Sequence, residues 1–130
     1  MTIRMNRPTA ILAALALLAP LSACDTRIKA PEDPRVCWRV TGQTPKVQFA
    51  ALSRDDANME TCAAHLEAIW KATHRPVIGA YAGVFIFIDR EGVRSGNDLE
   101  GAQYPLLTPE GRTQIDQAID ALNAVKPKTK

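Results

Sequence analysis

The sequence predicts a single α+β domain, in which a small, mostly antiparallel sheet is combined with two amphipathic helices. Two patterns support this class. Short runs of alternating apolar and polar residues are bounded by turn residues, as in half-buried strands. Two longer segments carry apolar residues at three- and four-residue steps, as in helices that cover a core. These segments follow one another in the order β-β-α-β-β-β-α, and no internal repeat is present.

The first two strands are expected at residues 36–40 and 46–52, joined by a turn that contains Pro45. Alternation in the first run places Trp38 on one face and Cys37 on the other. The two runs therefore predict a hairpin.

The first helix is expected to follow a capping box, in which Ser53 is the cap and Asp56 lies three residues later. It should end near Thr73. Glu67 and Lys71 lie off its apolar stripe, in the order that favours an exposed i,i+4 ion pair. The stripe consists of Met59, Cys62, Ala63, Leu66, Ile69 and Trp70.

Residues 77–89 are strongly apolar and predict a strand that is covered on both faces or that faces a partner. Gly79 and Gly83 predict a bulge or a tight turn within this run. Its twelve apolar residues are too few to span a bilayer. A turn then leads into Val93, and residues 103–107 are expected to form an edge strand.

The second helix is expected to begin at Thr108 as N-cap, with Pro109 in the first helical position, and to end before Pro127. Its apolar face consists of Ile115, Ala118, Ile119, Leu122 and Val125.

The chain begins with a basic segment, an apolar run at residues 10–21 and the sequence Leu21-Ser22-Ala23-Cys24. As a helix the run would reach roughly 18 Å, short of the ~30 Å hydrocarbon core. This order resembles a bacterial lipoprotein signal peptide with its lipobox. The resemblance implies that residues 1–23 are removed and that the Cys24 sulfur receives a diacylglycerol, often with acylation of the new amine. The alternative is an uncleaved or conventionally cleaved signal peptide with an incidental cysteine.

The same resemblance implies a protein anchored by lipid to the periplasmic side of a membrane. Asp25 favours the inner membrane, with the outer membrane as the alternative. Residues 24–35 carry prolines and charges of both signs and are expected to form a tether, followed by a globular domain at residues 36–126.

The charge balance gives no support for nucleic-acid binding. The chain has 16 basic and 14 acidic residues, and Arg4 and Arg7 belong to the predicted signal peptide, so the remainder is formally neutral. No cofactor is expected.

Besides Cys24, the chain contains Cys37 and Cys62. An even pair in an oxidising compartment predicts a disulfide between the first strand and the first helix. Closing a loop of about 26 residues would add roughly 3.5 kcal/mol to the free energy of unfolding. The alternative is two buried thiols.

Motifs for catalysis or metal binding are weak. His65 and His74 are nine residues apart, unlike an i,i+4 metal pair, and are expected on the surface. The loop at residues 89–100 resembles a calcium loop in its acidic positions, but Arg94 stands where glycine is required, so a polar hairpin loop is expected. The expected protein is not an enzyme, with a hydrolytic enzyme as a remote alternative. The loop carboxylates that would serve it are Asp89 with Glu91 and Asp98 with Glu100.

These observations predict a structural or protein-interaction module of the cell envelope. Tyr81, Phe85 and Phe87 are its candidate contact residues if one face of their strand is exposed, and otherwise belong to the core. Residues 47–53 with the following helix are also similar to the opening half of a SPOR domain. That resemblance implies, as the alternative, binding of peptidoglycan glycan strands on a sheet face.

Overall fold

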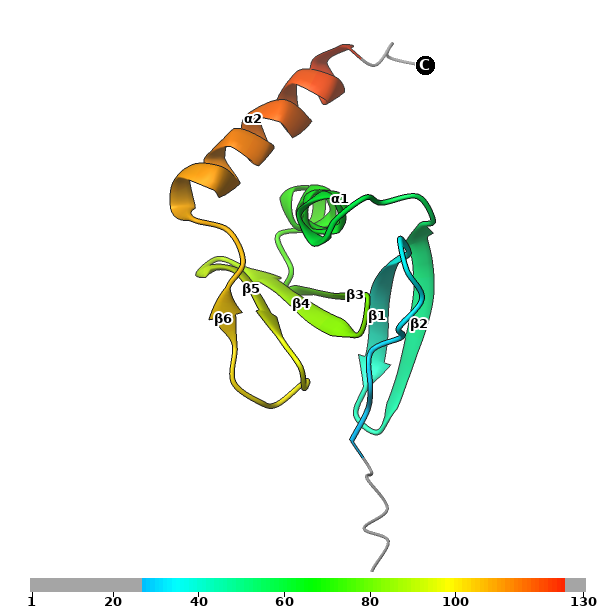
Figure 1. Cartoon of the computed structure of the whole chain (residues 1–130). Coiled ribbons are helices and arrows are strands. Elements are labelled where there is room, and N and C mark those ends of the chain that lie inside the picture. Colours follow the sequence, from blue (N-terminus) through cyan, green and yellow to red (C-terminus); the bar gives the residue numbers. More distant parts are fainter. Residues whose placement is uncertain (1–26, 126–130) are drawn as a thin grey trace, which may run out of the picture.

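The computed structural model describes residues 27–125, which form one six-stranded antiparallel sheet and two helices (Figure 1). The expected α+β class is confirmed. The strands lie in the order β2-β1-β3-β4-β5-β6. In chain order the elements are β1 (Cys37–Gln43), β2 (Lys46–Ser53), α1 (Met59–Thr73), β3 (Val77–Tyr81), β4 (Val84–Asp89), β5 (Gly92–Gly96), β6 (Tyr104–Pro105) and α2 (Pro109–Val125).

One face of the sheet is covered by α1, and α2 packs against α1 from the far side (Figure 1). The predicted apolar stripe of α1 meets the sheet, and Leu66 at its centre is fully buried. Gly79 in β3 permits this close packing, because a Cβ atom there would lie 2.3 Å from Leu66 Cδ1. The core on this face consists of Cys37, Cys62, Ala63, Leu66, Val77, Tyr81, Ile86, Ile88 and Val93.

The opposite face is covered by the segment that precedes β1. Ala30 is 5% exposed in a cluster with Phe85 and Phe87, and Gly83 donates its backbone N–H to Pro31 O at 2.8 Å. This corrects the predicted extent of the tether, since residues 27–35 belong to the folded domain. Sequence patterns miss such a segment because it packs through single residues and has no period.

The apolar run at 77–89 divides into β3 and β4. Of the bulge and the tight turn that its glycines predicted, the tight turn is present. Ala82 and Gly83 form the turn, with φ values of 47° and 82°. Positive φ at both positions is typical of a two-residue hairpin turn, which glycine adopts at little cost.

The predicted start of α1 was wrong. Asn58 is the N-cap, and its Oδ1 accepts a hydrogen bond from Thr61 N at 2.8 Å. Ser53 ends β2 instead, and its hydroxyl donates to Asp56 Oδ1 at 2.6 Å. Ser53 and Asp56, whose spacing predicted a helix cap, therefore belong to the end of β2 and to the loop at 54–58.

The predicted start of α2 is confirmed, since Thr108 Oγ1 accepts from Gly111 N at 3.0 Å and Pro109 is its first residue. The apolar face of α2 is not a core face, however. No residue of α2 is buried, and Leu122 and Val125 are 68% and 81% exposed. Of the predicted apolar stripe, Ile115 and Ile119 are half-buried, whereas Ala118, Leu122 and Val125 are exposed.

Candidate functional site

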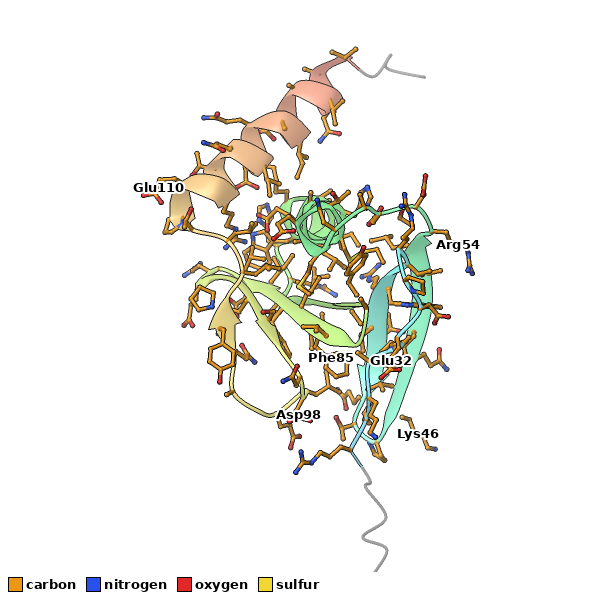
Figure 2. All side chains as sticks on the ribbon, viewed as in Figure 1. Glu32, Lys46, Arg54, Phe85, Asp98 and Glu110 are labelled. Carbon is orange, nitrogen blue, oxygen red and sulfur yellow. A yellow bond between two sulfur atoms is a disulfide. The ribbon has the colours of Figure 1, made fainter. Side chains whose placement is uncertain are left out.

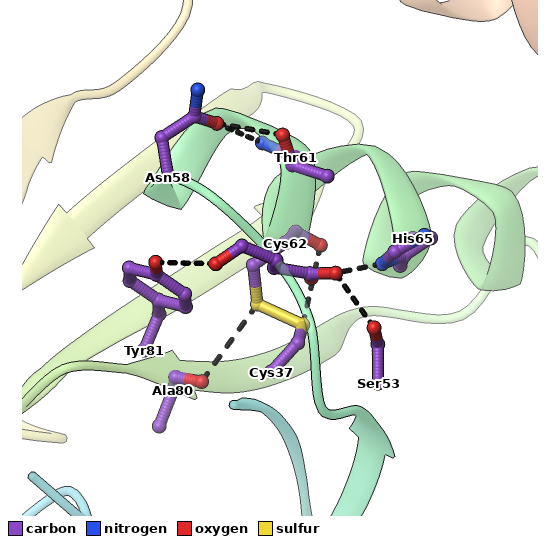
Figure 3. Close-up of a disulfide and its surroundings, with 9 residues drawn as sticks. Cys37, Ser53, Asn58, Thr61, Cys62, His65, Ala80 and Tyr81 are labelled. Carbon is purple, nitrogen blue, oxygen red and sulfur yellow. Dashed lines mark hydrogen bonds and ion pairs between the residues drawn. A yellow bond between two sulfur atoms is a disulfide. The ribbon is translucent and has the colours of Figure 1, made fainter. Parts of the chain in front are cut away.

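The predicted disulfide is present between Cys37, at the start of β1, and Cys62, in the first turn of α1 (Figure 3). Their Cα atoms are 5.2 Å apart, and neither residue is exposed to solvent. The bond joins the sheet to the helix that covers it. Cys24, the predicted lipidation site, lies outside the described residues.

A buried carboxylate lies beside this disulfide. Asp56 is only 2% exposed, and its Oδ1 and Oδ2 meet Ser53 Oγ at 2.6 Å and His65 Nδ1 at 3.0 Å (Figure 3). Its backbone is also fixed, because Asp56 O accepts from the Tyr81 hydroxyl at 2.8 Å. Both carboxylate oxygens therefore have partners, as a buried charge requires.

The order of these contacts does not match nucleophilic catalysis. In a serine triad the imidazole lies between hydroxyl and carboxylate, so that it can accept the hydroxyl proton. Here Asp56 lies between Ser53 and His65, and Ser53 donates to the carboxylate. The geometry instead holds the loop at 54–58 against α1.

One group of side chains in the described part of the chain has the composition and proximity of metal ligands. Ligand atoms of Cys37, Asp56 and His65 all lie within 4.8 Å of one another. Sequence reasoning missed this cluster, because Asp56 and His65 are nine residues apart and meet only through the loop before α1. In the oxidised domain the Cys37 sulfur is bonded to Cys62.

A second polar cluster lies between the two helices. Glu67 is fully buried, and Arg112 Nε donates to its Oε1 at 3.0 Å. Arg112 also donates through Nη1 to Asp89 O at 2.7 Å, and its guanidinium lies 5.7 Å from the centre of the Trp70 ring. The predicted pairing of Glu67 with Lys71 was wrong; Lys71 pairs with Asp120 of α2.

Burial raises the pKa of Glu67, and the neighbouring Asp116 carboxyl adds to this rise. Arg112 opposes it, both as a hydrogen-bond donor and as a positive charge. The cluster thus attaches α2 to α1 through the Glu67 carboxyl group, which stays protonated to a higher pH than an ordinary glutamate.

The three aromatic residues predicted as contacts are buried. Phe85 is fully enclosed, Phe87 is 7% exposed and Tyr81 is 8% exposed. Phe85 points away from the helices, into the cluster beneath the N-terminal segment (Figure 2). The three residues therefore belong to the core, which was the predicted alternative, because β3 and β4 are covered on both faces.

The two predicted pairs of loop carboxylates, Asp89 with Glu91 and Asp98 with Glu100, lie in different parts of the domain. Asp89 Oδ1 accepts from the backbone N–H groups of Glu91 and Gly92, at 2.9 and 3.2 Å, and its Oδ2 pairs with Arg94. Asp89 is therefore occupied in closing a tight turn. Asp98 lies at the other end of the sheet (Figure 2).

Asp98 and Glu100 line a cleft of about 420 Å³ at the end of the domain where residue 27 lies. Arg27 Nη1 is 3.7 Å from Asp98 Oδ2 across this cleft. The remaining lining residues are Ile28, Thr44, Pro45, Leu99 and Gly101. This is an open surface cleft without a histidine or a nucleophilic side chain beyond Thr44.

The histidines occupy different places. His65 is partly exposed and bonded to Asp56, whereas His74 caps the C-terminal end of α1, where its backbone N–H donates to Trp70 O at 2.7 Å. Its φ of 52° is left-handed. Both His65 and His74 are exposed, as predicted.

The chain matches no protein-family model, no curated protein and no solved structure. Among the described residues, neither helix is long and apolar enough to cross a membrane.

Proposed function

We propose that this protein is a lipid-anchored component of the bacterial cell envelope that binds a partner protein through the outward face of α2. Residues 21–24 supply the anchor, and the domain stands on the periplasmic side of the membrane. Asp25 favours the inner membrane.

The exposed apolar face of α2 is the observation that carries the interaction proposal. Ala118, Leu122 and Val125 are exposed, follow at three- and four-residue steps and therefore share one side of the helix, with the half-buried Ile115 beside them. Leu122 and Val125 are more exposed than any other large apolar residue described. A helix that is amphipathic but covered on one side only is typical of helix-mediated recognition.

The charges of α2 are placed so that they leave this face free. Arg112 and Asp120 pair with Glu67 and Lys71 of α1, on a neighbouring side of the helix. The outward stripe itself carries no charge. The apolar side of a second helix matches an uncharged linear stripe better than a charged polymer would. The proposed partner therefore presents an amphipathic helix.

The position of α2 fits this role. The blue segment before β1, which follows the proposed anchor in the sequence, begins at one end of the domain, and α2 lies at the other (Figure 1). An anchored domain would thus hold α2 away from the bilayer, where a partner can reach it.

The alternatives have less support. Glycan binding on an open sheet would compete with the N-terminal segment, which packs on the helix-free face through Ile28 and Ala30. Hydrolysis by a serine triad would need an imidazole between the hydroxyl and the carboxylate, and here the Asp56 carboxylate lies between Ser53 and His65.

A photo-cross-linking amino acid at position 122, in cells that express the full chain, tests the proposal. The expected result is one adduct with a membrane-associated protein. Position 52 is the matched control, because Leu52 is also apolar and 40% exposed but lies on β2. An adduct between two copies of this chain would mean that α2 mediates self-association and does not bind a different protein. Equal adducts from positions 122 and 52, or none from 122, would contradict docking on α2.

A further inference from the structure

Three side chains with metal-binding atoms, Cys37, Asp56 and His65, lie together at the disulfide, and a fourth, Cys62, is bonded to Cys37. Cys37 comes from β1, Asp56 from the loop before α1, and Cys62 and His65 from α1 itself. Cys62 and His65 are three residues apart and therefore lie on the same side of the helix. Their spacing is that of a helical chelating pair. Ligand atoms of Cys37, Asp56 and His65 already lie within 4.8 Å of one another, whereas the Cys62 sulfur lies 3.7 Å from Ala80 O and would have to turn toward them.

The distances suit a tetrahedral zinc ion. Nitrogen and oxygen ligands at 2.0–2.1 Å from zinc lie roughly 3.3 Å from each other. His65 Nδ1 and Asp56 Oδ2 are 3.0 Å apart in a hydrogen bond, so they already have about this spacing and would need to turn their lone pairs toward a shared ion. The two sulfur atoms must move from about 2.0 Å apart to roughly 3.8 Å apart, which rotation about the cysteine Cα–Cβ bonds can supply.

The surroundings supply the supporting contacts that metal ligands need. Asp56 Oδ1 is held by the Ser53 hydroxyl, and its backbone by Tyr81, so Oδ2 is fixed in direction. Cys37, Cys62 and Asp56 are buried, whereas the His65 side chain is 44% exposed. A cation could thus reach the site from the His65 side.

A divalent cation would bind the two thiolates that form on reduction, and the neighbouring Asp56 carboxylate would help to balance its charge.

We propose that the reduced domain binds one Zn²⁺ through Cys37, Cys62, Asp56 and His65, so that a disulfide and a metal ion are alternative links between β1 and α1. A dithiol or phosphine reductant supplies two electrons, and two protons convert the disulfide to two thiols. Zinc then displaces these two protons and binds two thiolates, neutral His65 and the Asp56 carboxylate. This inference is independent of the anchor and of the partner of α2.

The test uses the full chain in detergent with Cys24→Ser, so that Cys37 and Cys62 supply the only thiols. Co²⁺ is the probe, because thiolate-to-cobalt absorption reports sulfur ligation and competition with Zn²⁺ gives its affinity. One equivalent is expected to bind after reduction, and none before it.

His65→Asn and Asp56→Asn should each weaken binding by roughly tenfold or more. The matched controls, His74→Asn and Asp55→Asn, should leave binding unchanged. Circular dichroism measures folding in parallel. A reduced chain that stays unfolded with Zn²⁺, binds no Co²⁺, or binds it equally well in the His65 and Asp56 variants would overturn the proposal.

Discussion

Glu67 and Arg112 form an ion pair that joins α1 to α2, with 3.0 Å between Glu67 Oε1 and Arg112 Nε. The Glu67 side chain is 1% exposed and that of Arg112 14%. This is the main polar attachment of a helix that has no buried residue of its own. How α2 stays in place, and thus how its apolar face is presented, depends on this pair.

Arg112→Ala should destabilise the domain by about 3–5 kcal/mol, because it leaves a buried carboxyl group without its partner. Urea unfolding followed by circular dichroism measures this change. Lys71→Ala is the matched control: it removes the more exposed pair with Asp120 and should cost at most about 1 kcal/mol. Equal losses in the two variants would show that burial does not distinguish the pairs.

The raised pKa of Glu67 predicts a dependence of stability on pH. Its folded-state pKa lies above the unfolded value, so the folded state holds the proton more tightly. The stabilisation from this proton is complete below the ordinary pKa of glutamate and is lost as pH rises through the raised folded value. Stability from this group therefore falls with rising pH.

Glu67→Gln tests that sign, because an uncharged amide still offers an oxygen that can accept from Arg112 but carries no titrating proton. Relative to wild type, the variant should gain stability as pH rises from about 4 to about 7. Unfolding free energies across that range measure the difference. Glu60→Gln, at an exposed position of α1, should show no such trend, and a wild-type advantage that grows with pH would contradict the prediction.

Much of the fold follows from local pattern, and the site does not. Alternation and helical spacing identify the elements, and the even cysteine pair predicts the disulfide. The pairing of Glu67 with Arg112, 45 positions away, has no local signal, whereas Lys71 offered a local partner that the folded chain does not use. The exposed face of α2 was missed for a related reason: periodicity identifies an apolar stripe but not the surface that covers it.

The disulfide should be a major source of stability. Replacing both Cys37 and Cys62 by alanine is expected to lower the free energy of unfolding by roughly 3.5 kcal/mol, chiefly because the unfolded chain regains freedom. Reduction of the wild-type chain in the presence of a chelator should give a loss of similar size. A double variant as stable as the oxidised protein would refute this account.

The two helices should respond differently to truncation of leucine. Leu66→Ala removes a fully buried side chain and should cost about 2–5 kcal/mol. Leu122→Ala should change stability by no more than about 0.5 kcal/mol, since its side chain is exposed in the isolated domain. A large loss at Leu122 in the isolated protein would mean that this face is already covered, and docking on α2 would then lose its basis.

The proposed anchor depends on Cys24, and the intact mass of membrane-extracted protein tests it directly. The mass should exceed that of the polypeptide of residues 24–130 by a diacylglycerol, with a further acyl chain if the amine is modified. Stable anchoring needs this much lipid, because a single acyl chain gives only marginal membrane binding. Cys24→Ser should lack the lipid and retain residues 1–23, since the lipoprotein resemblance places lipidation before cleavage. An unmodified wild-type chain that begins at residue 24 would identify a conventional signal peptide, and α2 would then have to find its partner without a membrane anchor.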